Sequence, residues 1–232
     1  MTEGNKKQTM NDCFISKIDP NLVKNGLFLI GIVLFLAHIS GRIFFNVGYD
    51  AGMFNLDVEK NVPSVYSALL LASSGFLLIL ISDRIRKLKK KFAAHWFFLG
   101  VVFIFLAADE FFVIHEDWMN PIRESLNTSG LLYFAWIIPY VIFIVILFLA
   151  YLKFLKDLPR DIYLKFMASG FLFVFGGIVI ESFGGKYMES HFWQKDGMYF
   201  IMTTFEEMFE IIGISLFLYA LLIYIQKYLK PE

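Results

Sequence analysis

Cysteine is nearly absent from this 232-residue chain, and the formal net charge at neutral pH is zero. The one cysteine, Cys13, lies in a polar N-terminal segment, so a disulfide framework within the chain and a metal site built from several cysteines are excluded. The balanced charge argues against nucleic acid as a partner. The sequence also lacks the Walker, Gly-x-Ser-x-Gly, His-Glu-x-x-His and dinucleotide-binding motifs, which leaves the activity without a motif-based assignment.

Alternation of polar and apolar residues with a period of two is missing too, which argues against a transmembrane β-barrel. Apolar residues make up 58% of the chain, and 28 of them are phenylalanine. They come in blocks of about 18 or more residues, each long enough to cross roughly 30 Å of hydrocarbon as a helix. The sequence therefore predicts an all-α polytopic membrane protein, folded as a bundle of six transmembrane helices.

The apolar blocks also predict one domain. We expect a transmembrane domain over residues 22–226, preceded by a polar segment, 1–21, and followed by a short tail, 227–232. The first apolar run is too long for the core of a signal peptide, so we expect it to remain as the first span. The predicted spans are 22–47, 63–82, 92–114, 131–152, 163–183 and 198–225.

Basic residues are concentrated at one end of the predicted bundle. Only five of the 21 Lys and Arg residues fall at the other end: Arg42, Lys60, Arg123, Lys186 and Lys195. The excess of positive charge in cytoplasmic loops predicts that both termini lie in the cytoplasm and favours the plasma (inner) membrane. The densest run, Arg84–Lys91, is sufficiently explained as this topology signal, with a lipid-headgroup or partner site as the alternative.

Small residues predict where helices approach one another closely. The fifth span has glycines every seven residues, at Gly170, Gly177 and Gly184, and Glu181 shares that face. Pro139 is predicted to kink the fourth span. The second span carries a stripe of small residues: Ser64, Ser67, Ala68, Ser74 and Gly75.

Acidic residues gather in the outer halves of three spans that are distant in sequence. Asp109 and Glu110 end the third span, Glu181 lies near the end of the fifth, and Glu206, Glu207 and Glu210 lie in the sixth. Insertion of an ionised acid near mid-span costs about 2.5–3.5 kcal/mol, so such residues usually have a function. Protons, a metal ion or a fixed cation must relieve this cost, and the similar depth of the acids predicts one shared site.

The candidate ligands are rich in oxygen and poor in nitrogen, which favours a divalent ion of Mn, Fe, Mg or Ca, with Zn an alternative if two histidines join. We expect Asp109, Glu110, Glu206 and Glu210 to be the leading metal ligands. Glu207 or His115 would act as acid or base, and Arg42 would form a structural ion pair with a carboxylate. Further candidate ligands are Glu181 and His38.

These residues favour a metal-dependent, hydrolase-like membrane enzyme that acts on a lipid or another amphiphile at the outer leaflet. A proton- or cation-coupled transporter or channel would use the same carboxylates. A third alternative is a non-catalytic membrane subunit that docks a cationic partner. Few polar residues lie in the inner halves of the spans, and a site with a single polar mouth favours the enzyme over the transporter.

Overall fold

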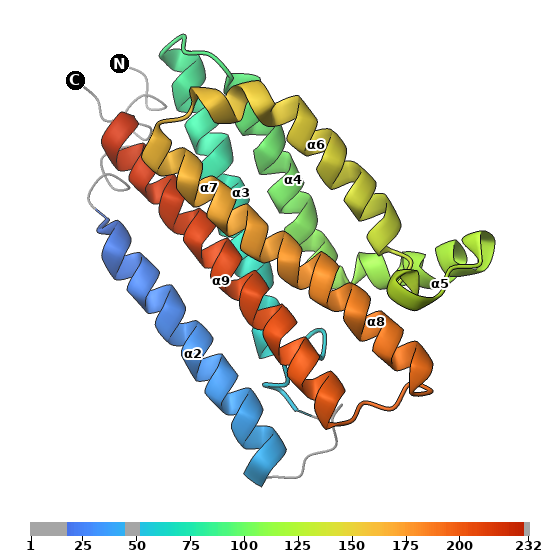
Figure 1. Cartoon of the computed structure of the whole chain (residues 1–232). Helices are drawn as coiled ribbons and strands as arrows, with labels where there is room; N and C mark the ends of the chain where they lie inside the picture. Colours follow the sequence, from blue (N-terminus) through green and yellow to red (C-terminus); the bar gives the residue numbers. More distant parts are fainter. Residues whose placement is uncertain (1–17, 45–51, 230–232) are drawn as a thin grey trace.

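The structure is a computed structural model that describes residues 18–44 and 52–229. Cys13, most of the predicted N-terminal segment, the predicted end of the first span and residues 230–232 lie outside these ranges. The described chain is all-helical (Figure 1). Six of its helices are long and apolar enough to cross a membrane: α2 (Pro20–Phe44), α3 (Val62–Lys87), α4 (Ala93–Phe112), α6 (Ile137–Asp157), the continuous run Arg160–Ser190, and α9 (Gly197–Tyr228).

The prediction of six apolar spanning helices is thereby confirmed, while the sides on which the termini lie stay a prediction. The fifth spanning segment is one rod built of three parts, which are α7 (Arg160–Val174), a π-helical turn η2 (Phe175–Ile180) and α8 (Glu181–Ser190). Figure 1 shows α9 lying along this rod on one side and along α2 on the other. The rod and α9 are both longer than predicted, because polar residues at their ends continue the helices.

Helices α3 and α4 form a tightly packed antiparallel pair. Asn61 begins α3 with a capping box, in which its side chain accepts the backbone N–H of Ser64 and the Ser64 hydroxyl accepts the N–H of Asn61. A β carbon on Gly75 would lie 3.0 Å from the carbonyl oxygen of Gly100, and a β carbon on Gly100 would lie 3.0 Å from that of Gly75. The predicted small-residue stripe of the second span is confirmed, since all five of its residues are buried in the described structure.

Helices α7 and α9 also cross at very short range, but the predicted glycine face is only partly correct. Gly170 is exposed, with open space where a β carbon would stand, and a β carbon on Gly184 would make ordinary contact with Tyr199. Gly177 does face α9, where a β carbon would collide with the Glu210 carboxylate. A further close approach is at Gly213 of α9, where a β carbon would lie 2.8 Å from the backbone nitrogen of Phe173. The π-helical turn changes the angular register of the rod, so a strict seven-residue repeat does not stay on one face.

We therefore expect Gly213→Ala to lower the free energy of unfolding by about 1–3 kcal/mol, because the added methyl group meets backbone atoms that cannot rotate away. Gly170→Ala is the matched control on the partner helix and should be neutral or slightly stabilising. Unfolding in detergent micelles measures both changes. Equal stability of Gly213→Ala and the wild type would show that α7 and α9 are not in this close contact.

The third predicted span, residues 92–114, corresponds to α4, and a sharp break follows it. Val113 ends α4 in the left-handed region, at φ 64°, and α5 (Ile114–Leu126) begins directly after it. This conformation is unusual for a β-branched residue. The Asp109 carboxylate stabilises it by accepting the backbone N–H of His115, in the first turn of α5, at 2.7 Å. The predicted span of residues 92–114 is therefore one helix that ends two residues earlier than predicted.

Helix α6 stands apart from its neighbours and makes the bundle asymmetric (Figure 1). It begins at Ile137, not near residue 131, because a short 3-10 turn, η1 (Gly130–Leu132), precedes it. The predicted kink at Pro139 was wrong, since Pro139 lies in the first turn of α6, where a backbone N–H has no partner within the helix. Most side chains in the middle of α6 are exposed, as expected of a helix in contact with lipid.

The end of the bundle opposite α5 is closed by a packed aromatic and aliphatic core. Trp96 of α4, Phe154 of α6 and Tyr224 of α9 pack together, with ring centroids 5.0 Å apart for Trp96 and Phe154 and 4.7 Å apart for Trp96 and Tyr224. Trp96 and Phe154 are each only 1% exposed. The basic connector after α3 lies at this end, which we call the basic end.

Candidate functional site

The space between α6 and the rest of the bundle is a single cavity of about 1030 Å³. Helices α4, α6, α7 and α9 supply its walls, and the first two contribute mainly phenylalanine and aliphatic side chains. Its apolar lining includes Phe98, Phe105, Phe143, Ile144, Leu147 and Phe148. Several of these side chains, Phe98 and Phe148 among them, are about half exposed, so the cavity opens between the helices toward the hydrocarbon.

The other end of the same cavity is strongly acidic. It is lined by one histidine, His115, one lysine, Lys195, and nine acidic residues: Asp57, Glu59, Asp109, Glu110, Glu116, Glu181, Glu206, Glu207 and Glu210. The structure thus brings the three acidic segments singled out from the sequence to one cavity. It adds a loop, residues 52–61, whose Asp57 and Glu59 were not among the candidate site residues predicted from the sequence.

Asp109 is the most fully partnered of these acids. One carboxylate oxygen accepts the backbone N–H of His115 at 2.7 Å and the His115 Nδ1–H at 3.2 Å. The other oxygen accepts the hydroxyl hydrogen of Tyr140, which comes from the first turn of α6. Asp109 is 5% exposed, so a buried carboxylate here is satisfied by three donors. The arrangement orients His115, and it leaves Nε2 as the ring nitrogen that Asp109 does not use.

His115 carries the positive charge of this part of the cavity. Burial lowers the pKa of His115, but the hydrogen bond and negative charge of Asp109 outweigh burial and raise that pKa to about 9. The imidazole also packs against Trp136 in a tilted arrangement, with ring centroids 4.9 Å apart. The break at Val113 is what turns the His115 ring back toward α4.

The acids of α9 lie against the π-helical turn of the rod. Glu206 is 9% exposed, and its carboxyl group lies within hydrogen-bonding reach of that of Glu181. A β carbon on Gly177 would collide with the carboxylate of Glu210, and one on Gly176 would lie 2.7 Å from the backbone oxygen of Glu206. The two glycines therefore make the space that the α9 carboxylates occupy, which agrees with the frequent location of π-helical turns at functional sites.

Glu207 and Glu210 face the end of α4. The carboxylate of Glu207 interacts electrostatically with those of Glu110 and Glu210, and Glu210 interacts with Glu110 and Glu181 as well. Ionised carboxylates that lie close together in a site of low dielectric constant repel one another strongly. The acidic residues of α9 thus differ from Asp109, because their neighbours are mainly other carboxyl groups and not hydrogen-bond donors.

The loop before α3 closes the acidic end, and it is more buried than a solvated cap would be. Asp57 forms an ion pair with Lys195 at 2.8 Å, and only 7% of its side chain is exposed. Burial raises the pKa of Asp57 to about 6, although the charge of Lys195 opposes that shift. Burial likewise raises the pKa of Glu59 to about 7, with His115 opposing. The alternation of Asn55, Asp57 and Glu59 along the chain was the one feature of the sequence that could have indicated that this loop belongs to the site.

His38 and Arg42 do not line this cavity. His38 is buried, and its Nδ1 accepts the backbone N–H of Leu56 while its Nε2 bonds to the Thr204 hydroxyl at 2.9 Å. Both ring nitrogens are therefore used to join α2, the loop and α9. The guanidinium of Arg42 lies 5.5 Å from the ring centroid of Phe200, and its expected ion pair with a carboxylate stays a prediction.

Within residues 18–44 and 52–229, no group of three or more His, Cys, Asp or Glu side chains is arranged to hold a metal ion. The acids predicted as ligands share a cavity, but they line a wide mouth and do not converge on one point. Asp109, predicted as a direct ligand, instead contacts His115 and Tyr140. The prediction of a bound divalent ion therefore remains a prediction.

Comparison of the chain with curated proteins and with solved structures finds no match. Residues 26–224 match a family model, and this match extends from the first turns of α2 to the last turn of α9. It therefore includes every segment that lines the cavity. On this match, the chain belongs to the family described as "Domain of unknown function (DUF8692)".

Proposed function

We propose that the protein is a membrane enzyme with hydrolase-like chemistry that acts on a lipid or another amphiphile of the outer leaflet. One observation carries the proposal: a single cavity of about 1030 Å³ combines a long apolar wall, open between α6 and α4, with a cluster of ionisable groups at one end. An amphiphile has the same division between an apolar chain and a polar head. Ligand cavities are commonly apolar with a few polar groups that fix orientation.

The apolar wall would hold the chain of the amphiphile. Phe105, Phe143 and Phe148 offer aromatic surface, while Gly170 leaves open space in the wall contributed by α7. Because α6 is held mainly near its ends and its middle is exposed, a chain would enter sideways from the lipid. The head would then lie beside the acidic residues and His115.

The ionisable groups support acid–base chemistry on an ester-type bond. A carboxylate of Glu207 or Glu110 would take a proton from water while the water oxygen attacks the scissile centre. His115, held by Asp109 through Nδ1, would give a proton from its other nitrogen to the departing oxygen as that bond breaks. An oriented imidazole with a buried carboxylate partner is the arrangement that such proton transfer requires. Tyr140 would hold Asp109 in place.

A divalent metal ion remains part of this proposal, with Mn, Fe, Mg, Ca and Zn as candidates. Glu181, Glu206 and Glu210 would supply oxygen ligands after side-chain rotation, and the ion would offset their mutual repulsion. A bound ion would polarise the substrate or activate water. Metal analysis of the purified protein tests this element, and a stoichiometric metal that Glu206→Gln removes is the expected result.

Transport through the same cavity is less well supported. The polar lining lies at one end only, and the basic end is closed by the Trp96, Phe154 and Tyr224 core. A transported cation would have to pass this core. An enzyme needs one polar mouth, as this cavity has.

The proposal is tested by filling the cavity. Gly170→Phe places an aromatic side chain in open space on the cavity wall, so the protein should remain folded and lose at least about tenfold in retained amphiphile. Gly26→Phe is the matched control, since Gly26 also has open space but lies on α2, away from the cavity. Mass spectrometry of amphiphiles retained through purification, and of products formed from a defined lipid set, measures the change. Equal retention and turnover in both variants would contradict the proposal.

A further inference from the structure

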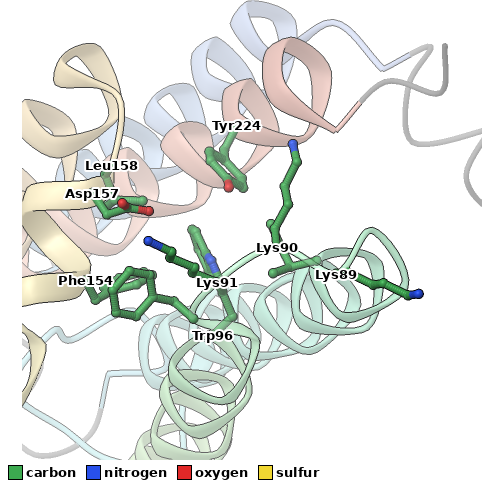
Figure 2. Close-up of a pocket in the computed structure, with 10 residues that line it drawn as sticks. Lys89, Lys90, Lys91, Trp96, Phe154, Asp157, Leu158 and Tyr224 are labelled. Atoms are coloured by element: carbon green, nitrogen blue, oxygen red, sulfur yellow. The ribbon is translucent and has the colours of Figure 1, made fainter.

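A second, smaller pocket lies at the basic end, far from the acidic mouth. It has a volume of about 330 Å³ and is formed where α3 ends, α4 begins, and α6 and α9 end (Figure 2). Its rim carries three consecutive lysines, Lys89, Lys90 and Lys91, and its floor is aromatic. The floor is formed by Phe92, Trp96, Phe154 and Tyr224.

The lysines of the rim are held in place by an unusual backbone. Lys89 and Phe92 both lie in the left-handed region, at φ 52° and 67°. This folds the connector between α3 and α4 tightly and brings its lysines over the aromatic floor. Figure 2 shows the Lys91 amine directed toward Asp157, Lys90 beside Tyr224, and Lys89 extending away from the other two.

The positive charge of this rim is not neutralised within the described chain. Asp83 pairs with Arg86 at 2.9 Å and with Lys87 at 2.7 Å, whereas no ion pair of Lys89, Lys90 or Lys91 is formed among residues 18–44 and 52–229. Lys90 reaches only the backbone oxygen of Tyr228, at 3.5 Å. Asp157, exposed on the opposite rim, is the one carboxylate that lines the pocket.

The first turn of α4 adds further attraction for an anion. Phe92 is its N-cap residue and provides no side-chain hydrogen bond to the free backbone N–H groups. These groups and the helix dipole favour a negative group at that position. The pocket thus combines lysines, an uncapped helix N-terminus and an aromatic floor. These features are complementary to a phosphate group that is bonded to an apolar group.

We propose that this pocket binds the phosphate-bearing headgroup of an anionic phospholipid. Lys90 and Lys91 contact the phosphate, and the glycerol and first methylenes pack on Trp96 and Phe154. Basic pockets between transmembrane helices at the cytoplasmic face bind anionic headgroups in this way, and the charge distribution predicts that this end is cytoplasmic. Asp157 weakens binding by competing for Lys91, and it disfavours more highly charged ligands.

The test uses the full-length protein in detergent with dioctanoyl phosphatidylglycerol, dioctanoyl phosphatidylcholine or inorganic phosphate. Phosphatidylglycerol should raise Tm, and the other two should not at the same concentration. Lys90→Gln with Lys91→Gln should weaken the apparent affinity for phosphatidylglycerol by about 25-fold, or about fivefold for each basic residue. Asp157→Asn should strengthen it.

The matched control is Lys153→Gln with Lys156→Gln, which removes two exposed lysines from the same end but not from the pocket rim. It should keep the wild-type affinity. Equal loss in both double variants would show general attraction to a basic surface and overturn the proposal. A rise in Tm with inorganic phosphate as large as that with phosphatidylglycerol would overturn the lipid as the source of the phosphate. No stabilisation by any of the three ligands would overturn the site.

Discussion

Asp109→Asn is expected to lower the free energy of unfolding by about 3 kcal/mol, although it removes an acid from a crowded acidic cavity. The reason is that the Asp109 carboxylate is satisfied by His115 and Tyr140 and also stabilises the break at Val113. The variant leaves the His115 imidazolium without its anion and places an amide nitrogen where the Asp109 carboxylate accepted the Tyr140 hydroxyl. Unfolding of the purified protein in detergent micelles measures the loss.

The matched control is Asp117→Asn, which removes the same charge from an exposed position on α5 and should change stability by less than about 0.5 kcal/mol. In the double variant with His115→Gln, the losses should not add, because both substitutions break one interaction. Additive losses, or a stable Asp109→Asn protein, would mean that Asp109 does not hold His115.

The pH dependence gives an independent check on this pair. The folded-state pKa of His115, about 9, lies above the ordinary value of 6.5, so its stabilising contribution is complete below pH 6.5 and is lost as pH rises through 9. The wild type should therefore lose up to about 3 kcal/mol between pH 7 and pH 10. Asp109→Asn and His115→Gln should each flatten this slope, whereas His191→Gln should retain it.

Glu206→Gln is expected to have the opposite effect and to stabilise the protein by about 1–3 kcal/mol in the absence of divalent metal ions. Glu206 is buried against the carboxyl group of Glu181 and close to Glu207 and Glu210. The amide of glutamine can donate to the Glu181 carboxylate without a shared proton, and it removes an acid that must either take up a proton or repel its neighbouring carboxylates. The shape of the side chain is unchanged, so packing against Gly176 is preserved.

Unfolding measured after dialysis against a chelator tests this gain. Glu124→Gln, an exposed change of the same type on α5, should leave stability unchanged. If the cavity holds a divalent ion, adding that ion should stabilise the wild type and not Glu206→Gln. A fall in stability of Glu206→Gln without any metal present would indicate that the α9 acids are paired with donors and are not in mutual repulsion.

The number of spanning helices and the grouping of the acids could be predicted from the sequence, because both follow from local composition. A run of about 20 apolar residues must form a helix in lipid, where each backbone polar group needs a partner within its own segment. Acidic residues such as Glu206 and Glu210 are easily recognised within an apolar run. Because they are four residues apart, they lie on one face of the helix. The predicted small-residue face of α3 followed from the same kind of local rule.

The roles of the individual acids could not be predicted in this way. Asp109 and Glu110 are adjacent in sequence, yet one is fully partnered and the other is surrounded by carboxylates. The difference arises at Val113, where the chain turns and brings His115 back to Asp109. A left-handed valine has no signature in the sequence, because tertiary contacts must stabilise it against its own preference.

Hydropathy and charge act through composition alone, so an all-helical membrane protein with six apolar spans, a basic end and an acidic end is predictable without coordinates. Packing of the helices, in contrast, makes α6 stand apart and leave a lipid-facing cavity, and it places Asp57 but not His38 at the acidic end. The physical reason is that lipid accepts any apolar helix surface, so hydropathy does not specify which helices touch. That choice depends on close approaches such as those at Gly176 and Gly213, where the absence of a side chain permits backbone contact.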